Sequence, residues 1–173
     1  MVKFIPINLD LHKSHLIKLT EEYFTWINDE VQKRYNIDTF TIIGESILEY
    51  SERTLEDLTS YIPPEGIYYV IQNDDSIIGM GALKIIKKGI GEIKRMYIRP
   101  NYRGNGYGKK ILEVLLEKGK EFGFSSIRLD TGEFMAAAQK VYRLAGFQER
   151  ERYLESEVPT SFLPHWLFME KLV

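Results

Sequence analysis

Apolar positions in the first half of the chain predict helices followed by a change to strands. Residues 4–9 alternate like a short strand, and apolar side chains at helical spacing predict helices over 11–30 and 44–60. Strands follow over 67–72 and 77–86, joined by Asn, Asp and Ser residues that suit a hairpin turn. This half of the chain therefore predicts helices before an antiparallel hairpin.

The second half predicts strands that alternate with helices. A further strand ends at Pro100, which has no N–H for a continuing ladder. The elements predicted here are a strand over 91–100, a helix over 111–122, a strand over 125–131, a helix over 135–145 and a strand over 165–173. Because no repeat or Pro/Gly/Ser-rich linker is visible, we expect one domain over residues 1–173, of α/β or α+β class, with helices covering a sheet.

Composition excludes several classes of protein. With 44% hydrophobic and 28% charged residues and a net charge of −2, the chain is typical of a soluble globular protein and not of a general nucleic-acid binder. The absence of cysteine excludes disulfides, thiol nucleophiles and cysteine metal sites. No secretory h-region or membrane-length apolar run is visible, so we expect a cytoplasmic protein without a membrane partner.

One segment, IRPNYRGNGYGKK (residues 98–110), combines glycines with positive charge between a predicted strand and a predicted helix. Six Lys/Arg residues and no Asp or Glu lie between Lys94 and Lys110. The unpaired N–H groups at a helix N-terminus attract anions, and glycines allow the backbone to approach a ligand closely. The segment therefore indicates a bound anion, and a diphosphate suits it better than a bare turn.

The glycine spacing departs from both common nucleotide-binding loops. Residues 104–108, Gly-Asn-Gly-Tyr-Gly, are one residue short of the Rossmann fingerprint G-x-G-x-x-G. A Walker A loop needs Ser or Thr after Gly-Lys, whereas Gly108-Lys109 is followed by Lys110. On the loop alone, a nucleotide-binding domain and a loop that binds nothing both remain open.

Two motifs together resemble a known enzyme family. Arg103-x-x-Gly106-x-Gly108, after an extended strand and before an amphipathic helix, resembles the acyl-CoA-binding motif of the GCN5-related N-acetyltransferases, the GNAT family. Residues 136–147, AAAQKVYRLAGF, are similar to that family's later helix, with Tyr142 four residues before Gly-Phe. The resemblance covers residues 66–147. It implies a mixed, mostly antiparallel central sheet with helices on both faces, and acetyl-CoA as acyl donor without a metal.

The resemblance also implies which residues hold the donor. Backbone groups of Met96, Tyr97 and Ile98 would pair with the pantetheine arm along a strand that splays from its neighbour, and Tyr142 would lie beside the CoA sulfur. Backbone N–H groups of the loop would hold the diphosphate; the loop residues are Arg103, Gly104, Asn105, Gly106, Tyr107, Gly108 and Lys109. Family members often have Asn seven residues before the tyrosine, where it touches the cofactor, whereas this chain has Met135. Whether this position contacts acetyl-CoA therefore stays open.

Acetyl transfer to an amine needs one base and one weak acid. An alkyl ammonium has a pKa near 10.4, so a carboxylate that takes its proton makes attack possible, and a hydroxyl that protonates the departing thiolate, of pKa near 8.5, speeds its release. We predict Tyr142 as the acid, the alternative being a core tyrosine on the apolar stripe of its helix. We predict Glu92 as the base, because some family members carry a catalytic Glu at the matching position.

The choice of base leaves alternatives open. Strict alternation puts Glu92, Lys94, Met96 and Ile98 on one strand face, unless a bulge lies between them. Glu92 could also be an ordinary strand carboxylate paired with Lys or Arg. Asp130 and Glu133 are rival bases, since we expect them to lie just beyond a strand C-terminus, where α/β sites form.

The predicted activity is acetyl transfer from acetyl-CoA to a primary amine by direct attack in a ternary complex; the alternative is a non-catalytic acyl-CoA or nucleotide-binding module. The acceptor is a small-molecule or peptide amine, and a homodimer stays open. The acceptor pocket is expected from residues 10–65 and 148–165. Aromatic residues there could wall it or pack in the core: Tyr23, Phe24, Trp26, Tyr35 and Phe40. His12, His15 and His165 lack metal-ligand spacing.

Overall fold

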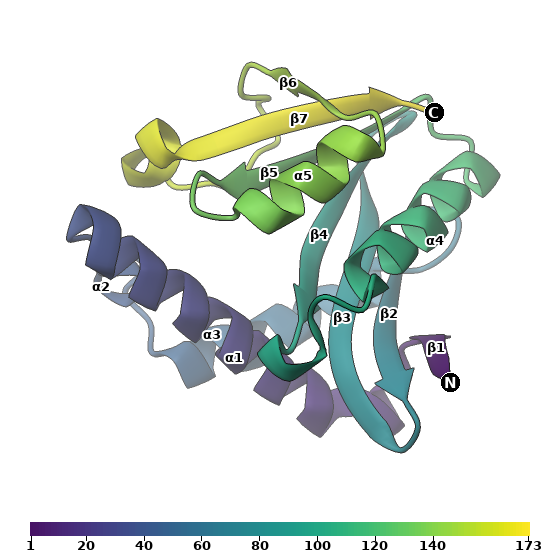
Figure 1. Cartoon of the computed structure of the whole chain (residues 1–173), viewed down its shortest axis with the longest axis horizontal. Helices are drawn as coiled ribbons and strands as arrows, with labels where there is room; N and C mark the ends of the chain where they lie inside the picture. Colours follow the sequence, from purple (N-terminus) through teal and green to yellow (C-terminus); the bar gives the residue numbers. More distant parts are fainter.

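A seven-stranded sheet forms the centre of the molecule in a computed structural model that describes residues 1–173, apart from the side chains of Glu56 and Thr59 (Figure 1). The strands are β1 (Val2–Pro6), β2 (Gly66–Asn73), β3 (Ser76–Lys87), β4 (Ile90–Ile98), β5 (Ser126–Gly132), β6 (Gln148–Arg150) and β7 (Trp166–Leu172). Their spatial order is β1-β2-β3-β4-β5-β7-β6. Only β4 and β5 pair in parallel, so the sheet is mixed and mostly antiparallel, which confirms the predicted class.

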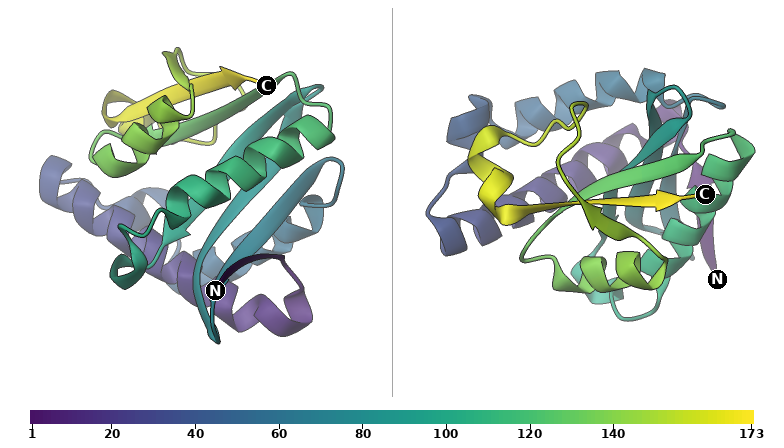
Figure 2. Two further views of the ribbon diagram at one scale, coloured as in Figure 1. Left: turned by 45° about the vertical axis from the view of Figure 1, so that its right-hand side comes forward. Right: turned by 90° about the horizontal axis from the view of Figure 1, so that it is seen from above.

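Helices cover both faces of this sheet (Figure 2). The helices are α1 (Leu9–Tyr35), α2 (Thr39–Ile43), α3 (Ile47–Glu56), α4 (Tyr107–Glu121) and α5 (Ala136–Leu144), with short 3₁₀ turns at Asp57–Ser60, Pro100–Tyr102 and Thr160–His165. On one face, Leu16 and Leu19 of α1 pack with Val70 and Met80. On the other, α4 and α5 cover a second core cluster. None of the described helices is long and apolar enough to cross a membrane.

The apolar stripe of α4 shows why the second half of the chain folds as predicted. Ile111, Leu112 and Leu115 recur at helical spacing and are fully buried against the sheet. Burying each such side chain stabilises the fold by about 1.5–3 kcal/mol. Gly123, with φ of 77°, follows the helix in the left-handed conformation that ends it.

Short elements account for the differences from the predicted boundaries. The helix predicted over 44–60 begins only at Ile47, because Ser46 caps it and forms a capping box with Glu49. Neither the five-residue α2 nor the three-residue β6 was predicted, since neither is long enough to show a period. Asp130 also lies within β5 rather than beyond its end.

A β-bulge in β4 sets which side chains share a face. Lys94 pairs with Ala82 and Tyr97 with Met80, so two residues of β4, Arg95 and Met96, lie opposite one residue of β3. Arg95 has φ of 54°, in the left-handed region. The bulge is the exception left open for this strand, and strict alternation does not hold across it.

The faces divide on either side of the bulge. Glu92 and Lys94 stay together on the α1/α3 side, where their charged groups lie 3.1 Å apart. Met96 and Ile98 pack instead with the core cluster under α4. The side chains of Met96 and Ile98 therefore lie on the opposite face of the strand from Glu92, whereas Tyr97 packs on the α1 side.

Candidate active site

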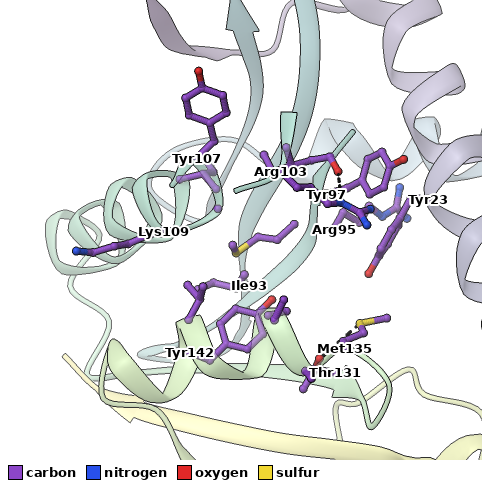
Figure 3. A pocket seen from close by; sticks show the side chains of 18 of the residues that line it. Tyr23, Ile93, Arg95, Tyr97, Arg103, Tyr107, Lys109, Thr131, Met135 and Tyr142 are labelled. Atoms are coloured by element: carbon purple, nitrogen blue, oxygen red, sulfur yellow. Dashed lines mark hydrogen bonds between the residues drawn. The ribbon is translucent and has the colours of Figure 1, made fainter. Parts of the chain in front are cut away.

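A cavity opens where β4 and β5 separate. The two strands pair over only three positions, from Ile90 with Ser126 to Glu92 with Arg128, and β4 then continues alone to Ile98. The splayed strand predicted from the family resemblance is thus present. The cavity between the strands, about 520 Å³ in volume, has the size of a small-molecule site and is also lined by α1, α4 and α5 (Figure 3).

The glycine loop presents an open backbone at the mouth of this cavity. Gly104 and Gly106 have φ of 82° and 76°, and a Cβ added at either glycine, or at Gly108, would meet no heavy atom within 4 Å. The first backbone bond of α4 runs from Lys110 N–H to the Gly106 carbonyl at 3.1 Å. In the described chain, no backbone carbonyl accepts from the N–H groups between Gly104 and Lys109. These groups fit a diphosphate, because they form a concave set of donors at a helix N-terminus.

The Arg103 side chain has a position that the motif did not predict. Its Nε donates to the Ile98 carbonyl at 2.9 Å, and its guanidinium lies over the rings of Trp26 and Tyr97, at 5.1 and 5.6 Å from their centroids. The side chain therefore fixes the start of the glycine loop against the end of β4 and against α1.

Tyr142 lies on α5 and lines the cavity opposite β4 (Figure 3). It is only 6% exposed, and its ring packs edge-on against Phe147 with 6.0 Å between centroids. Burial, together with the charge of Asp130, raises the pKa of the Tyr142 phenol. The hydroxyl therefore stays protonated at neutral pH, and the ring also belongs to the core, which was the alternative considered for Tyr142.

Asp130 is the one of the three candidate carboxylates that lines the described cavity. The Trp166 Nε1–H donates to its Oδ1 at 2.7 Å, which leaves the second oxygen without a side-chain donor among the described residues. Burial, and next the negative charge of Glu92, raise the pKa of Asp130 to about 6. A carboxylate with this pKa is ionised at neutral pH and still accepts a proton readily.

Glu92 lies behind the cavity wall and is completely buried. The Tyr153 hydroxyl donates to its Oε1, and the Lys94 ammonium lies 3.1 Å from its Oε2. Lys94 also pairs with Glu157, so one cation serves two carboxylates. The paired strand carboxylate considered as an alternative is thus observed, and Glu92 also influences Asp130 through its charge.

Tyr153 was not found from the sequence. It lies 61 positions from Glu92 in a segment without regular structure, and no motif marks it.

Glu133, the third candidate, faces a different set of partners. It accepts a hydrogen bond from the Tyr35 hydroxyl at 3.2 Å and lies 3.5 Å from His165 Nδ1. The rings of Tyr35 and His165 stack with 3.6 Å between centroids. These contacts join the end of α1 to the segment before β7, outside the described cavity lining.

Aromatic and apolar side chains form the remaining cavity wall. Tyr23 and Trp26 of α1 line the cavity, and Phe134 joins them, with 5.7 Å between the Trp26 and Phe134 ring centroids. Phe24 packs instead on Tyr50. Met135 lies on the wall where family members often have Asn, and it accepts a 3.5 Å contact from the Thr131 hydroxyl.

Comparison with known proteins places this site within a family. A profile described as "Acetyltransferase (GNAT) family" matches residues 20–147. The IAA acetyltransferase of Azospirillum brasilense is 33% identical over 118 residues, which are 68% of this chain and 74% of that protein.

Solved structures share the fold over the whole chain. An acetyltransferase of the GNAT family from Staphylococcus aureus has a TM-score of 0.71 at 22% identity, with 99% of each chain covered. The PaiA N-acetyltransferase of Thermoplasma acidophilum, solved with coenzyme A, has a TM-score of 0.70 at 19% identity, covering 100% of this chain and 99% of that one. With the profile match over residues 20–147, these likenesses show that the chain belongs to the GNAT family of acetyltransferases.

Proposed function

We propose that the protein transfers an acetyl group from acetyl-CoA to a primary amine by direct attack in a ternary complex. The observation that carries this proposal is the convergence of three features on one cavity: the splayed strand β4, the open glycine loop and the Tyr142 hydroxyl. Coenzyme A in the PaiA N-acetyltransferase structure supports the same donor.

The donor would lie along β4 and across the loop. Backbone groups of Met96, Tyr97 and Ile98 have no strand partner on the β5 side, so they are free to pair with the pantetheine amides as an added strand would. The N–H groups from Gly104 through Lys109 would hold the diphosphate, helped by the positive end of α4. The Arg103 N–H, also predicted as a donor, is not available, because it already donates to the Pro100 carbonyl at 3.1 Å. This arrangement of the donor places the thioester near Tyr142.

The reaction needs only proton transfers from the protein. The neutral amine nitrogen attacks the thioester carbonyl carbon, a C–N bond forms, and the C–S bond breaks with its electron pair going to sulfur. The Tyr142 hydroxyl gives its proton to the thiolate, and a carboxylate takes the proton that the amine loses. The carboxyl group then releases its proton and the Tyr142 phenolate takes one up, so the products are an N-acetyl amine and the free thiol of CoA, and the protein is unchanged.

Two coupled carboxylates are available to take the amine proton. Glu92 occupies the position of a catalytic Glu in some family members. We retain it as a candidate base, although its side chain is buried next to the cavity and does not line it. Asp130 reaches the cavity directly, and its pKa of about 6 suits the task. We therefore propose Asp130 as the group that receives the proton, with the charge of Glu92 raising its basicity.

Turnover distinguishes this function from its alternatives. Acetyl-CoA mixed with a panel of primary amines should release free thiol only when a suitable amine is present. A non-catalytic acyl-CoA module would bind CoA with no thiol release for any amine, and a nucleotide-binding domain would bind ADP or NAD as tightly as CoA. Either result would exclude the proposed activity.

The glycine loop provides a prediction with a matched control. Gly106→Ala should weaken CoA binding at least about 10-fold, because the new methyl group occupies open space that the diphosphate approaches. Alanine at φ of 76° also costs about 1–2 kcal/mol, which lowers the melting temperature by a few degrees. Calorimetric titration with CoA measures the first effect.

Gly123→Ala is the control, because Gly123 has φ of 77°, has nothing within 4 Å of an added Cβ, and follows the other end of α4. It should show the same thermal loss with unchanged CoA affinity. Equal loss of affinity in both variants would show that strain, and not the loop surface, controls binding.

A further inference from the structure

Arg95 is a partly buried cation that lines the cavity. It belongs to the bulge of β4, with φ of 54°, a conformation that costs a non-glycine residue free energy and occurs often at functional sites. The bulge turns Arg95 toward the α1/α3 side, where its guanidinium lies 6.0 Å from the centroid of the Phe24 ring. The strand is thus distorted at the residue that brings a charge to this cavity.

No carboxylate among the described side chains forms an ion pair with Arg95. The other cations of the cavity are either paired or solvated: Lys94 contacts both Glu92 and Glu157, and Arg103 is exposed at the rim. Phenols surround Arg95 instead, namely those of Tyr50, Tyr61 and Tyr68. The charge of Glu157 also acts on Arg95, but Glu157 forms its ion pair with Lys94. A partly buried guanidinium without a paired carboxylate therefore favours an anion supplied from outside the chain.

The position of Tyr23 relates Arg95 to the reacting groups. The Tyr23 phenol interacts electrostatically with Arg95 and also with Tyr142 and Asp130. Figure 3 shows Arg95 and Tyr23 on one side of the cavity, across from Tyr142. A small molecule that spans this gap can place one end at Arg95 and the other near the proposed base.

We propose that the acceptor is an amine that also carries a carboxylate, of the amino-acid class, and that Arg95 binds this carboxylate. A guanidinium offers two parallel N–H donors that match a carboxylate, and the aromatic wall formed by Tyr23, Trp26 and Phe134 suits an apolar side chain. Asp130 lies beside the amine in this arrangement. The inference rests on the proposed function and names its substrate class.

The test compares amino acids with their amides. L-alanine, L-leucine, L-methionine and L-phenylalanine, each beside its carboxamide, are assayed with acetyl-CoA for kcat/KM. Arg95→Gln should lower the ratio of kcat/KM for the amino acid to kcat/KM for its carboxamide by about 10- to 100-fold. Only the amino acids should lose activity, because only they have a carboxylate for the guanidinium to bind. Arg95→Lys should lie between, because it keeps the charge without the paired donors. An amino acid and its carboxamide differ in the pKa of the amine. Comparing the ratio in the variant with the ratio in the unmodified protein removes this difference, because the same two substrates are used for both proteins.

Arg53→Gln is the matched control, since Arg53 also lies on an aromatic ring, that of Tyr50 at 5.2 Å, but already pairs with Glu45. It should leave the ratio unchanged. CoA titration confirms that each variant is folded. A ratio that Arg95→Gln leaves unchanged, or an equal loss for acids and amides, would overturn the inference, because a residue that only balances Glu157 affects both acceptors alike.

A separate binding measurement distinguishes failure of the inference from failure of the proposed function. If no amine is acetylated, the proposed function fails, and the carboxylate site is then tested by titrating N-acetyl-L-phenylalanine and its amide into the protein with CoA. Tighter binding of the acid that Arg95→Gln abolishes supports the site. Equal affinity for acid and amide, or no binding of either, overturns it.

Discussion

Replacing Tyr142 by phenylalanine should lower kcat about 100-fold while CoA affinity stays within about twofold. The ring is only 6% exposed and packs on Phe147, so phenylalanine preserves the packing and removes only the hydroxyl. Without that proton donor, sulfur must leave as a thiolate, which is a poorer leaving group than a thiol. Steady-state kinetics with thiol detection, together with CoA titration, measure the two quantities.

Tyr69→Phe is the control for this prediction. Tyr69 is 5% exposed and belongs to the same core cluster as Tyr142, but it is not among the described residues that line the cavity. Its kcat should match that of the unmodified protein. If Tyr142→Phe also retained full kcat, Tyr142 would be a core residue, and the thiolate would need another proton source.

The second large effect concerns the two carboxylates and depends on pH. A base must be ionised to act, so activity should fall as the pH drops below about 6, the pKa of Asp130. If Asp130 is the base, Asp130→Asn should lower kcat at least about 100-fold and remove this acid limb. Glu92→Gln should then move the limb to lower pH, because loss of its negative charge lowers the pKa of Asp130.

The opposite pattern identifies Glu92 as the base. In that case Glu92→Gln removes the limb and Asp130→Asn only shifts it. These pH profiles are measured with an acceptor amine of low pKa, so that ionisation of the acceptor does not fall within the pH range of the acid limb. Retention of the acid limb at its original position in both variants would exclude both carboxylates.

Asp130→Asn also has an effect on stability that needs no substrate. The fold raises the pKa of Asp130 above that of the unfolded chain, so the folded state favours the protonated form, and ionisation destabilises it as the pH rises through about 6. Asparagine removes this cost, so the variant should melt a few degrees higher at pH 8 and show a smaller gain at pH 4. Thermal unfolding at the two pH values measures the difference.

The sequence was most informative where one residue type has a specific physical role. Glycines at positive φ and the apolar stripe of α4 indicated the anion loop, and both are in place. The bulge at Arg95 was not predictable, because an arginine at positive φ leaves no pattern in the sequence. The same bulge separated Met96 from Glu92, against the expectation of strict alternation.

Contacts between distant segments account for the rest of what was missed. Tyr153 holds Glu92 across 61 positions, and Trp166 holds Asp130 across 36. Local spacing contains no information on such pairs, since they form only when β5 and β7 pair and the segment after β6 folds over β4. Which of the candidate carboxylates lines the cavity could therefore be learned only from the three-dimensional structure.

A quenched single turnover tests direct transfer in the ternary complex. Protein in excess over acetyl-CoA labelled in the acetyl group is mixed with an acceptor amine, stopped in acid at intervals, and analysed by mass spectrometry for label on the amine and on the protein. With direct transfer, label on the amine should equal the thiol released at every time point, with no label on the protein and no thiol released without amine. Label that appears first on the protein, or thiol released without amine, would contradict direct transfer.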